Sequence, residues 1–167
     1  AGSNAFQKDI STADSGSQSE LAKAEFDLFA RELIKAGIEI IVVDDTKDPP
    51  KPDAVFPNNW FSTHILDDGR GLIFIYPMMS ELRRKEVRYD VVNMLAEKYS
   101  YGIEDLSKSA GVIEGTGSIV FDHVNKRAFA ALSPRTQESL LNEVCGKIGY
   151  EPVLFTAVDK GLQEVYH

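Results

Sequence analysis

The sequence predicts an α/β fold in which a unit of strand, strand and helix occurs twice. From Trp60 two short apolar runs flank the turn DDGRG and an amphipathic helical pattern follows, and the same order returns in the second half of the chain. When the chain is compared with itself at a shift of 57 residues, Val55 meets Val112, Pro77 meets Pro134 and the two hairpin turns coincide. Aligned hairpins and aligned prolines together indicate an internal repeat.

Size and composition are those of one globular domain. At 167 residues and 18.5 kDa, with 43% hydrophobic and 26% charged residues, the chain can bury a core of its own. The net charge of −8 and the isoelectric point near 4.9 argue against binding to nucleic acid or to an anionic membrane. A single cysteine excludes an internal disulfide, and no apolar run is long enough to span a membrane. We therefore expect a cytoplasmic protein.

The N-terminal part is predicted to contain a loop, a helix and a strand. Residues 8–20 are small and polar and indicate a mobile loop. A helix follows from Ser19 and ends at Gly37, a residue type common at helix C-caps. Residues 38–43 (IEIIVV) are mostly apolar, which favours a strand buried on both faces. The helix is expected to bury Ala22, Phe26, Phe29 and Leu33 on one face.

The first repeat is expected to contain a hairpin and a long helix. Its strands are predicted at residues 60–66 and 72–76, on either side of DDGRG. The pattern SELRRKEVRYDVVNMLAEKY then predicts one helix over residues 80–99, with Ser80 as its N-cap.

The second repeat is expected to follow the same plan. GSIVFD (117–122) and RAFAAL (127–132) predict a hairpin around HVNK. Pro134 would open a helix over residues 135–148, at a position where its missing N–H costs nothing. A strand is predicted at residues 150–157.

This repeat places polar residues at equivalent strand ends. An apolar pair precedes Asn58 and Asn59, another precedes Glu114, and the terminal VYH gives a third partial start that ends in His167. Repeats arranged around an axis bring such ends together at the centre. Two amides, a carboxylate and an imidazole that converge on one point form an active-site constellation.

Four stretches, PDAVFPNNWFSTH (52–64), EGTGS (114–118), SPRT (133–136) and the terminal VYH, resemble a known family. They are similar to the citrulline-utilisation hydrolases, the arginine-deiminase-related branch of the amidinotransferase (pentein) superfamily. The resemblance covers nearly the whole chain and implies a five-bladed α/β propeller of ββαβ units around a central substrate pocket. About half of the five blades would be present, so residues 1–167 are expected to form a single pentein domain that is incomplete at its C-terminus.

The resemblance also implies catalytic roles for two residues. Glu114 matches the pocket glutamate of the family, and His167 matches the histidine that acts as general acid and base. The family's nucleophile is a cysteine near the C-terminus that attacks the guanidino or ureido carbon. This chain has no matching cysteine, because Cys145 lies in the middle of a predicted helix. The family implies no cofactor.

Substrate-binding roles follow from the same resemblance. Asn58 and Asn59 lie in the first motif, and Asn59 takes the place of an aspartate in related deiminases. Arg83, in RRKE, and Arg135, in SPRT, resemble the arginines that hold a substrate α-carboxylate.

Each of these candidates also has a purely structural explanation. Asn58 and Asn59 are residue types that often bond their own backbone in turns. Glu114 precedes Gly-Thr-Gly and fits a solvated turn. Arg83 fits an exposed helix pair with Glu86, three residues further on.

Position helps to weigh the histidines and Arg135. His167 at the end of the chain resembles a frayed terminus, His64 fits a satisfied polar residue, and His123 fits a solvated hairpin turn. The three histidines lack metal-ligand spacing, so no metal site is expected.

Arg135 would lie in the first turn of a helix, where the dipole disfavours a cation, and this favours a role with a ligand.

The chemistry of Asn59 suggests a substrate. A carboxylate matches a guanidinium, whereas an amide both donates and accepts and so matches a neutral ureido group. This favours hydrolysis of citrulline to ornithine, carbon dioxide and ammonia. Arginine deimination and a succinylarginine dihydrolase-like reaction stay open, as does a non-catalytic ligand-binding propeller remnant. The expected partner is a small molecule, and a homodimer stays open.

Overall fold

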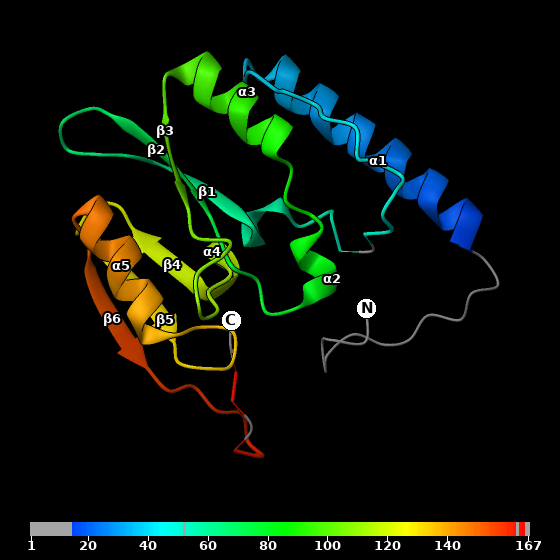
Figure 1. Cartoon of the computed structure of the whole chain (residues 1–167). Helices are drawn as coiled ribbons and strands as arrows, with labels where there is room; N and C mark the ends of the chain where they lie inside the picture. The colour runs from blue at the N-terminus through cyan, green and yellow to red at the C-terminus, as the bar shows by residue number, and fades with distance from the viewer. Residues whose placement is uncertain (1–14, 52, 163, 166–167) are drawn as a thin grey trace. The chain divides into compact units, whose positions relative to one another are not determined.

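The computed structural model describes residues 15–51, 53–162 and 164–165. Contacts divide the chain into two compact units, Ala1–Thr46 and Lys47–His167 (Figure 1). Every predicted element of the two repeats belongs to the second unit. Among the described residues, no helix is both long enough and apolar enough to cross a membrane.

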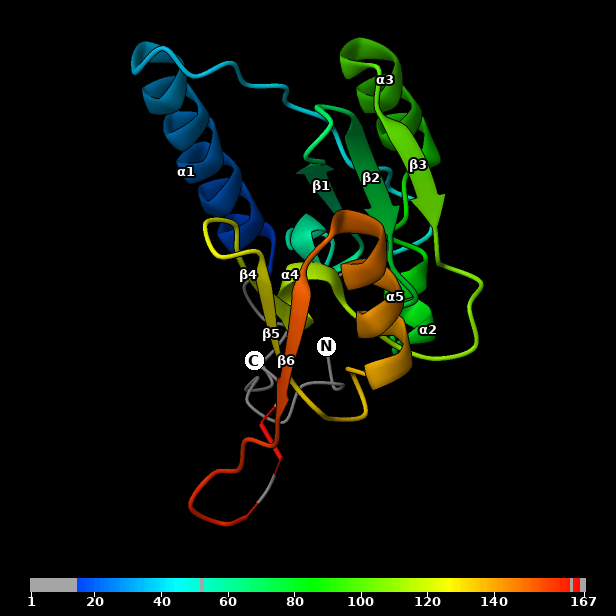
Figure 2. The same ribbon diagram turned by 90° about the vertical axis from the view of Figure 1, so that its left-hand side faces the viewer.

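The first unit contains one long helix, α1 (Ser15–Lys35), drawn in blue in Figures 1 and 2. It ends in a Schellman motif: Ile38 donates to the carbonyl of Leu33 at 3.1 Å, and Gly37, at φ 83°, donates to that of Ile34 at 3.0 Å. The predicted C-cap is therefore confirmed. The predicted loop over residues 8–20 is wrong for residues 15–20, because small polar residues cost a helix less than about 1 kcal/mol each and do not stop it, and residues 8–14 lie outside the described residues.

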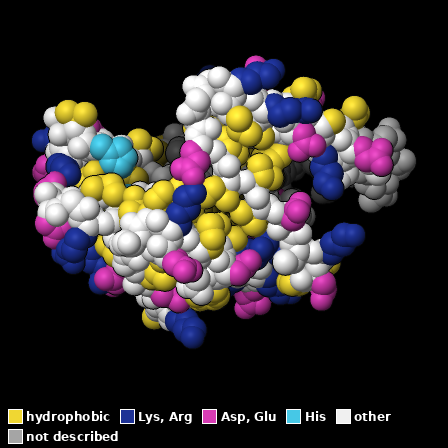
Figure 3. Space-filling model, turned by 90° about the horizontal axis from the view of Figure 1, so that it is seen from above, with side chains coloured by type: hydrophobic (Ala, Val, Ile, Leu, Met, Phe, Trp, Pro, Cys, Tyr) yellow, Lys and Arg dark blue, Asp and Glu magenta, His cyan; other side chains and the backbone are white. Residues whose placement is uncertain are grey.

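Apolar residues of the first unit are largely exposed, and hydrophobic side chains also reach the surface in Figure 3. Phe26 and Phe29, predicted on a buried face, are 52% and 61% exposed. Residues 38–43 form no strand, since no described strand pairs with them, and Val42 is 55% exposed. The predicted buried strand is thus wrong: an apolar run becomes a strand only beside a partner for its backbone.

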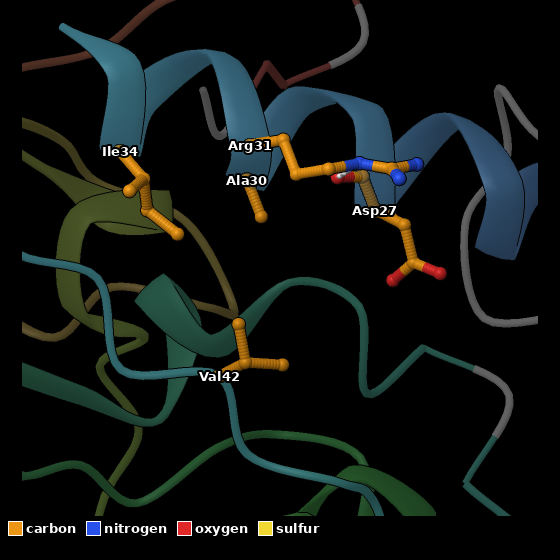
Figure 4. A pocket seen from close by; sticks show the side chains of 5 residues that line it. All are labelled: Asp27, Ala30, Arg31, Ile34 and Val42. Carbon is orange, nitrogen blue, oxygen red and sulfur yellow. Dashed lines mark hydrogen bonds between the residues drawn. The ribbon is translucent and has the colours of Figure 1, made fainter.

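A shallow groove of roughly 290 Å³ lies within the first unit, between α1 and the segment that follows it (Figure 4). Its lining residues are Asp27, Ala30, Arg31, Ile34 and Val42. Nε of Arg31 donates to the backbone carbonyl of Asp27 at 3.1 Å, so the polar side of the groove is partly committed to the helix itself. No residue of the candidate site lines this groove.

The second unit contains two three-stranded sheets of the same topology. The first consists of β1 (Phe61–Ile65), β2 (Gly71–Ile75) and β3 (Gly102–Asp105), and the second of β4 (Ile119–Asp122), β5 (Arg127–Ala131) and β6 (Glu151–Phe155). In each sheet the strand order follows the sequence, the first two strands are antiparallel, and the last two are parallel. The predicted repeat is confirmed, and each copy has the order ββαβ.

A helix connects the central strand of each sheet to its third strand, as a parallel connection requires. These helices are α3 (Tyr89–Tyr99) and α5 (Glu138–Ile148), seen beside their sheets in Figures 1 and 2. Both end in a left-handed residue, Ser100 at φ 57° and Gly149 at φ 73°. The strand β3 was not predicted, because GIED offers a single large apolar residue to signal it.

Two predicted helices have different boundaries in the structure. The helix expected over residues 80–99 is divided into α2 (Glu81–Arg84) and α3, because Glu86 turns inward onto Arg83 between them. Ser80 is the N-cap of α2, although its side chain makes no capping hydrogen bond. The helix expected over residues 135–148 begins only at Glu138, since residues 133–136 form a turn closed by backbone hydrogen bonds.

The core of the second unit is organised around β2, whose side chains alternate between two clusters. Phe74, with Tyr76 just beyond the strand, packs in the cluster that contains the buried face of α5. Ile73 and Ile75 pack in the other cluster, which contains Val92 of α3. Burial on both faces fixes β2 tightly, and with it the segment from Tyr76 to Met79 that borders the candidate site.

Candidate functional site

Two short turns bring the first two sequence motifs together. The turn η2 (Pro57–Asn59) contacts α4 (Gly115–Ser118). Gly115 has φ +45°, and a Cβ there would lie 2.4 Å from the carbonyl oxygen of Asn58. A Cβ at Gly117 would lie 2.3 Å from Nδ2 of Asn59. Only glycine permits these approaches, so both glycines of EGTGS have a steric reason.

Glu114 lies at the centre of this contact and is 1% exposed. Nη1 of Arg135 donates to both of its carboxylate oxygens at 3.1 Å. The backbone N–H of Met79 donates to Oε1 at 3.0 Å, and Nδ2 of Asn59 donates to Oε2 at 3.3 Å. A buried carboxyl group needs such hydrogen-bond partners, so these residues hold the side chain of Glu114 in one orientation.

Ser118 holds the backbone of the same site. Its Oγ accepts from the N–H of Glu114 at 3.1 Å and donates to the carbonyl of Arg135 at 2.9 Å. This serine was not predicted as a site residue, although it is the last residue of EGTGS. The signal that could have found it is a hydroxyl residue four positions after Glu114 in the same motif.

Arg83 lies in a second buried ion pair beside the first. Its Nε and Nη2 donate to the two carboxylate oxygens of Glu86 at 2.9 and 3.0 Å, and Nη2 also approaches the carbonyl of Phe56 at 3.3 Å. Burial alone would lower the pKa of Arg83, but its bonds and charge contact with Glu86, followed by the charges of Glu114 and Asp53, raise that pKa. The predicted pairing with Glu86 exists, but it is buried, with side chains 9% and 1% exposed, and not on a helix surface.

Asp53 is a site residue that sequence reasoning missed. It is 8% exposed, and its charge acts on Arg83. An acidic residue within the otherwise uncharged PDAVFPNNW was the signal that could have found it. The buried cluster thus contains three carboxylates, Asp53, Glu86 and Glu114, for two guanidinium groups, Arg83 and Arg135.

The remaining predicted residues have different positions. Asn58 is exposed, and only its backbone carbonyl is seen to contact the described residues of the site, where it accepts from Oγ1 of Thr116 at 3.4 Å. His167 lies outside the described residues, so its role stays a prediction. Cys145 is buried in α5, where burial raises the pKa of its thiol to about 11, and such a thiol is a poor nucleophile.

Arg135 lies in the site, but not at the predicted position in a helix. It was expected in the first turn of a helix, but α5 begins at Glu138 and Arg135 lies in the preceding turn. The helix dipole therefore does not act on it as predicted. Its candidate role rests on the direct bonds to Glu114.

The two described histidines differ in exposure: His64 is buried, and His123 lies in the exposed turn between β4 and β5. His64 is 5% exposed and its Nε2 lies 2.8 Å from Oγ of Ser62. Burial, followed by the charge of His123, lowers the pKa of His64 to about 4. His123 is exposed in the hairpin turn, as predicted, and its Nδ1 lies 2.7 Å from the hydroxyl of Tyr150. Among the described residues, no group of three or more His, Cys, Asp or Glu is arranged to hold a metal ion.

Two ββαβ repeats with a buried carboxylate–arginine cluster at their turns define an α/β protein with the pentein fold. Solved structures of ArgZ, an arginine dihydrolase from the ornithine–ammonia cycle in cyanobacteria, share this fold. Its N-terminal domain, in a mutant bound to substrate, matches with a TM-score of 0.60 and 18% identity over 84% of this chain and 48% of that chain. The same domain bound to product gives 0.58 and 19% over 83% and 46%, and the apo structure of ArgZ gives 0.62 and 18% over 87% and 22%.

The family model of eukaryotic N,N-dimethylarginine dimethylhydrolase matches residues 1–167, so the chain belongs to this family. The pentein superfamily predicted from the motifs is confirmed, whereas the citrulline-utilisation branch stays a prediction. No curated relative matches the chain. The chain spans about half the length of the ArgZ N-terminal domains it matches.

Proposed function

We propose that this chain supplies the substrate-binding part of a hydrolase that cleaves a guanidino C–N bond of arginine or an N-methylated arginine. The observation that carries this proposal is the buried carboxylate of Glu114, which Asn59 and Arg135 hold in place beside the buried pair of Arg83 and Glu86. A carboxylate accepts hydrogen bonds from the N–H groups of a guanidinium, and its negative charge attracts a cationic ligand more strongly than a neutral one. Membership of the dimethylarginine dimethylhydrolase family supports the same class of reaction.

The orientation of Asn59 supports a guanidino substrate. The carboxylate of Glu114 can only accept, so the NH₂ group of Asn59 must face it. Nδ2 of Asn59 accordingly lies 3.3 Å from Oε2 of Glu114. This leaves Oδ1 of Asn59 directed elsewhere, and no described residue donates to that oxygen. A guanidinium group offers only N–H donors, so Oδ1 can accept from it.

Arg83 is the better placed of the two arginines for a substrate carboxylate. Its Nε and Nη2 are engaged by Glu86 and by backbone carbonyls, and no described residue accepts from Nη1. Nη1 therefore keeps two N–H donors in a fixed orientation for an α-carboxylate. Arg135 is committed to Glu114 and acts on the substrate mainly through that carboxylate.

The proposed reaction needs a thiolate that the described residues do not provide. A cysteine thiolate attacks the guanidino carbon, and the C–N bond to ammonia or a methylated amine breaks as His167 donates a proton to the leaving nitrogen. Water, deprotonated by the same histidine, then attacks the carbon and expels the thiolate. The products are citrulline and the amine. Glu114 accepts hydrogen bonds from the guanidino nitrogens throughout and keeps the carbon in line with the thiolate.

Citrulline is a second candidate substrate, because the amide of Asn59 retains a second N–H that could donate to a ureido oxygen. Cleavage would then give ornithine, carbon dioxide and ammonia. The negative charge of the Glu114 carboxylate favours the guanidino substrates, and the assay must therefore compare both classes.

The test is a product assay on the full-length protein with arginine, asymmetric dimethylarginine and citrulline as separate substrates. We expect turnover of a guanidino substrate, reduced roughly hundredfold in kcat/KM by Glu114→Gln. Glu143→Gln makes the same change on the exposed face of α5 and should leave kcat/KM unchanged. Turnover of citrulline alone would overturn the guanidino assignment. Saturable binding without turnover of any of the three would favour a ligand-binding protein.

A further inference from the structure

We infer that Ser62 and Tyr76, anchored by His64, are positioning residues for Glu114. The inference rests on the proposed function, because it concerns the carboxylate that would bind the guanidino group. It is drawn from a hydrogen-bonded chain that runs from the space between the two sheets to the turn that carries Glu114.

The hydrogen-bonded chain begins at His64, passes through Ser62 and ends at Tyr76. Oγ of Ser62 lies 2.8 Å from Nε2 of His64 and 2.7 Å from the hydroxyl of Tyr76. Ser62 and His64 are two residues apart on β1, so they share a face of the sheet. Tyr76 follows β2 immediately and is 1% exposed. Two neighbouring strands thus place the three polar groups in one line.

Ser62 is the link on which both hydrogen bonds depend. A serine hydroxyl has one hydrogen, so it must donate to one neighbour and accept from the other in either direction of the chain. Its removal therefore breaks both bonds at once. A buried polar group left without a partner costs about 1–3 kcal/mol, so the ring of Tyr76 and the imidazole of His64 would both relax.

The ring of Tyr76 connects this chain to Glu114. A Cβ at Gly115 would lie 3.1 Å from ring atoms Cδ2 and Cε2 of Tyr76, so the ring packs directly on the residue that follows Glu114. The neighbouring residue, Pro77, accepts from the N–H of Ile113 at 3.2 Å on the other side of Glu114. Tyr76 and Pro77 therefore hold the backbone before and after Glu114. Movement of the ring would move the carboxylate.

The surroundings of His64 favour the neutral form of its imidazole. Nδ1 of His64 is buried and has no hydrogen-bond partner among the described residues. The groups packed around the imidazole are aromatic, Phe74 from β2 and Phe121 from β4, with His123 as the other titratable group near its ring. A second N–H on this ring would be unsatisfied, so the neutral imidazole is the anchor.

The test compares Ser62→Ala with Ser62→Thr in the full-length protein. Ser62→Ala should lower kcat/KM for the guanidino substrate by roughly tenfold or more, because small displacements of binding groups are costly to catalysis. Ser62→Thr keeps the hydroxyl on a strand that accepts β-branched residues, so it should restore most of the activity. Tyr76→Phe keeps the ring and loses its hydroxyl, and should fall between them.

Tyr150→Phe is the matched control. It removes a histidine–tyrosine hydrogen bond of 2.7 Å between His123 and Tyr150, away from Glu114. We expect this variant to lose stability without losing kcat/KM. Equal losses of kcat/KM in Tyr150→Phe and Ser62→Ala would overturn the positioning role.

A second readout does not need turnover. The amide of Met79 donates to Oε1 of Glu114, so its resonance in protein labelled with ¹⁵N-methionine reports the position of the carboxylate. Ser62→Ala should shift this resonance, and Ser62→Thr and Tyr150→Phe should not. If no substrate is turned over, the proposed function fails, but this resonance still decides the inference: an unchanged Met79 signal in Ser62→Ala overturns it.

Discussion

Nη1 of Arg135 bonds both carboxylate oxygens of Glu114 at 3.1 Å, and the two side chains are only 7% and 2% exposed. The partners lie in different elements, one in the turn before α5 and the other just before α4. An ion pair this deeply buried is costly to form and more costly to break, since the remaining charge stays in a poorly solvated place. The pair therefore couples the stability of the second repeat to the geometry of the candidate site.

The first prediction concerns this pair. Arg135→Gln should lower the free energy of unfolding by about 3–5 kcal/mol, because it leaves the charge of Glu114 without its main partner. Arg127→Gln breaks the exposed pair between Arg127 and Glu151 and should cost at most about 1 kcal/mol. Urea unfolding of both variants measures the difference. Equal, small losses would mean that Glu114 does not depend on Arg135.

The second prediction concerns Glu86, which orients Arg83 through bonds of 2.9 and 3.0 Å. Glu86→Gln keeps the shape of the side chain but allows only one oxygen to accept. We expect KM for the guanidino substrate to rise roughly tenfold with a smaller change in kcat, because the guanidinium of Arg83 loses its fixed orientation. Steady-state kinetics measures this, with Glu97→Gln on the exposed part of α3 as the control. A fall in kcat alone would contradict it.

The repeated part of the fold was predictable because its signals are local. Two apolar runs around a turn predict a hairpin wherever they occur, and the shift of 57 residues matched the hairpins of both repeats. The match fails beyond the hairpins, because the first repeat inserts α2, which has no counterpart in the second. Residues 38–43 show a different limit. Their apolar composition predicts burial but does not say which partner supplies it.

The site was predictable to the extent that its residues belong to short motifs. Asn59, Glu114 and Arg135 were found through PNN, EGTGS and SPRT, and the structure brings these three into direct contact. Asp53 and Ser118 were missed because their roles depend on which side chains fold against them. The sequence offers only an indirect signal for Asp53, a lone acidic residue in an otherwise uncharged motif, and does not name Arg83 as the group its charge acts on.

The third prediction tests the close approach of the two turns. Gly117→Ala would place a methyl group 2.3 Å from Nδ2 of Asn59 and displace the amide from Glu114. We expect kcat/KM to fall roughly tenfold or more. Gly146→Ala is the matched control, since no atom lies within 4 Å of a Cβ at this position in α5 and alanine should stabilise the helix by about 0.5–1 kcal/mol. Activity measurements and thermal unfolding distinguish the two, and an active Gly117→Ala protein would show that the contact is not needed.

The fourth prediction concerns the dependence of stability on pH. The pKa of His64 is lowered from 6.5 to about 4 in the folded protein, so between these values the unfolded state binds more protons than the folded state. Stability should therefore rise with pH across this window, by up to about 1.4 kcal/mol per pH unit, and be fully present above the unfolded pKa. His64→Phe should remove this part of the slope, whereas His123→Gln leaves His64 in its buried position and should retain most of it. Urea unfolding at pH 4.5, 5.5 and 7 measures how the free energy of unfolding of each variant changes with pH. If this pH dependence is the same in the wild type and in His64→Phe, His64 is not the buried, neutral end of the hydrogen-bonded chain through Ser62.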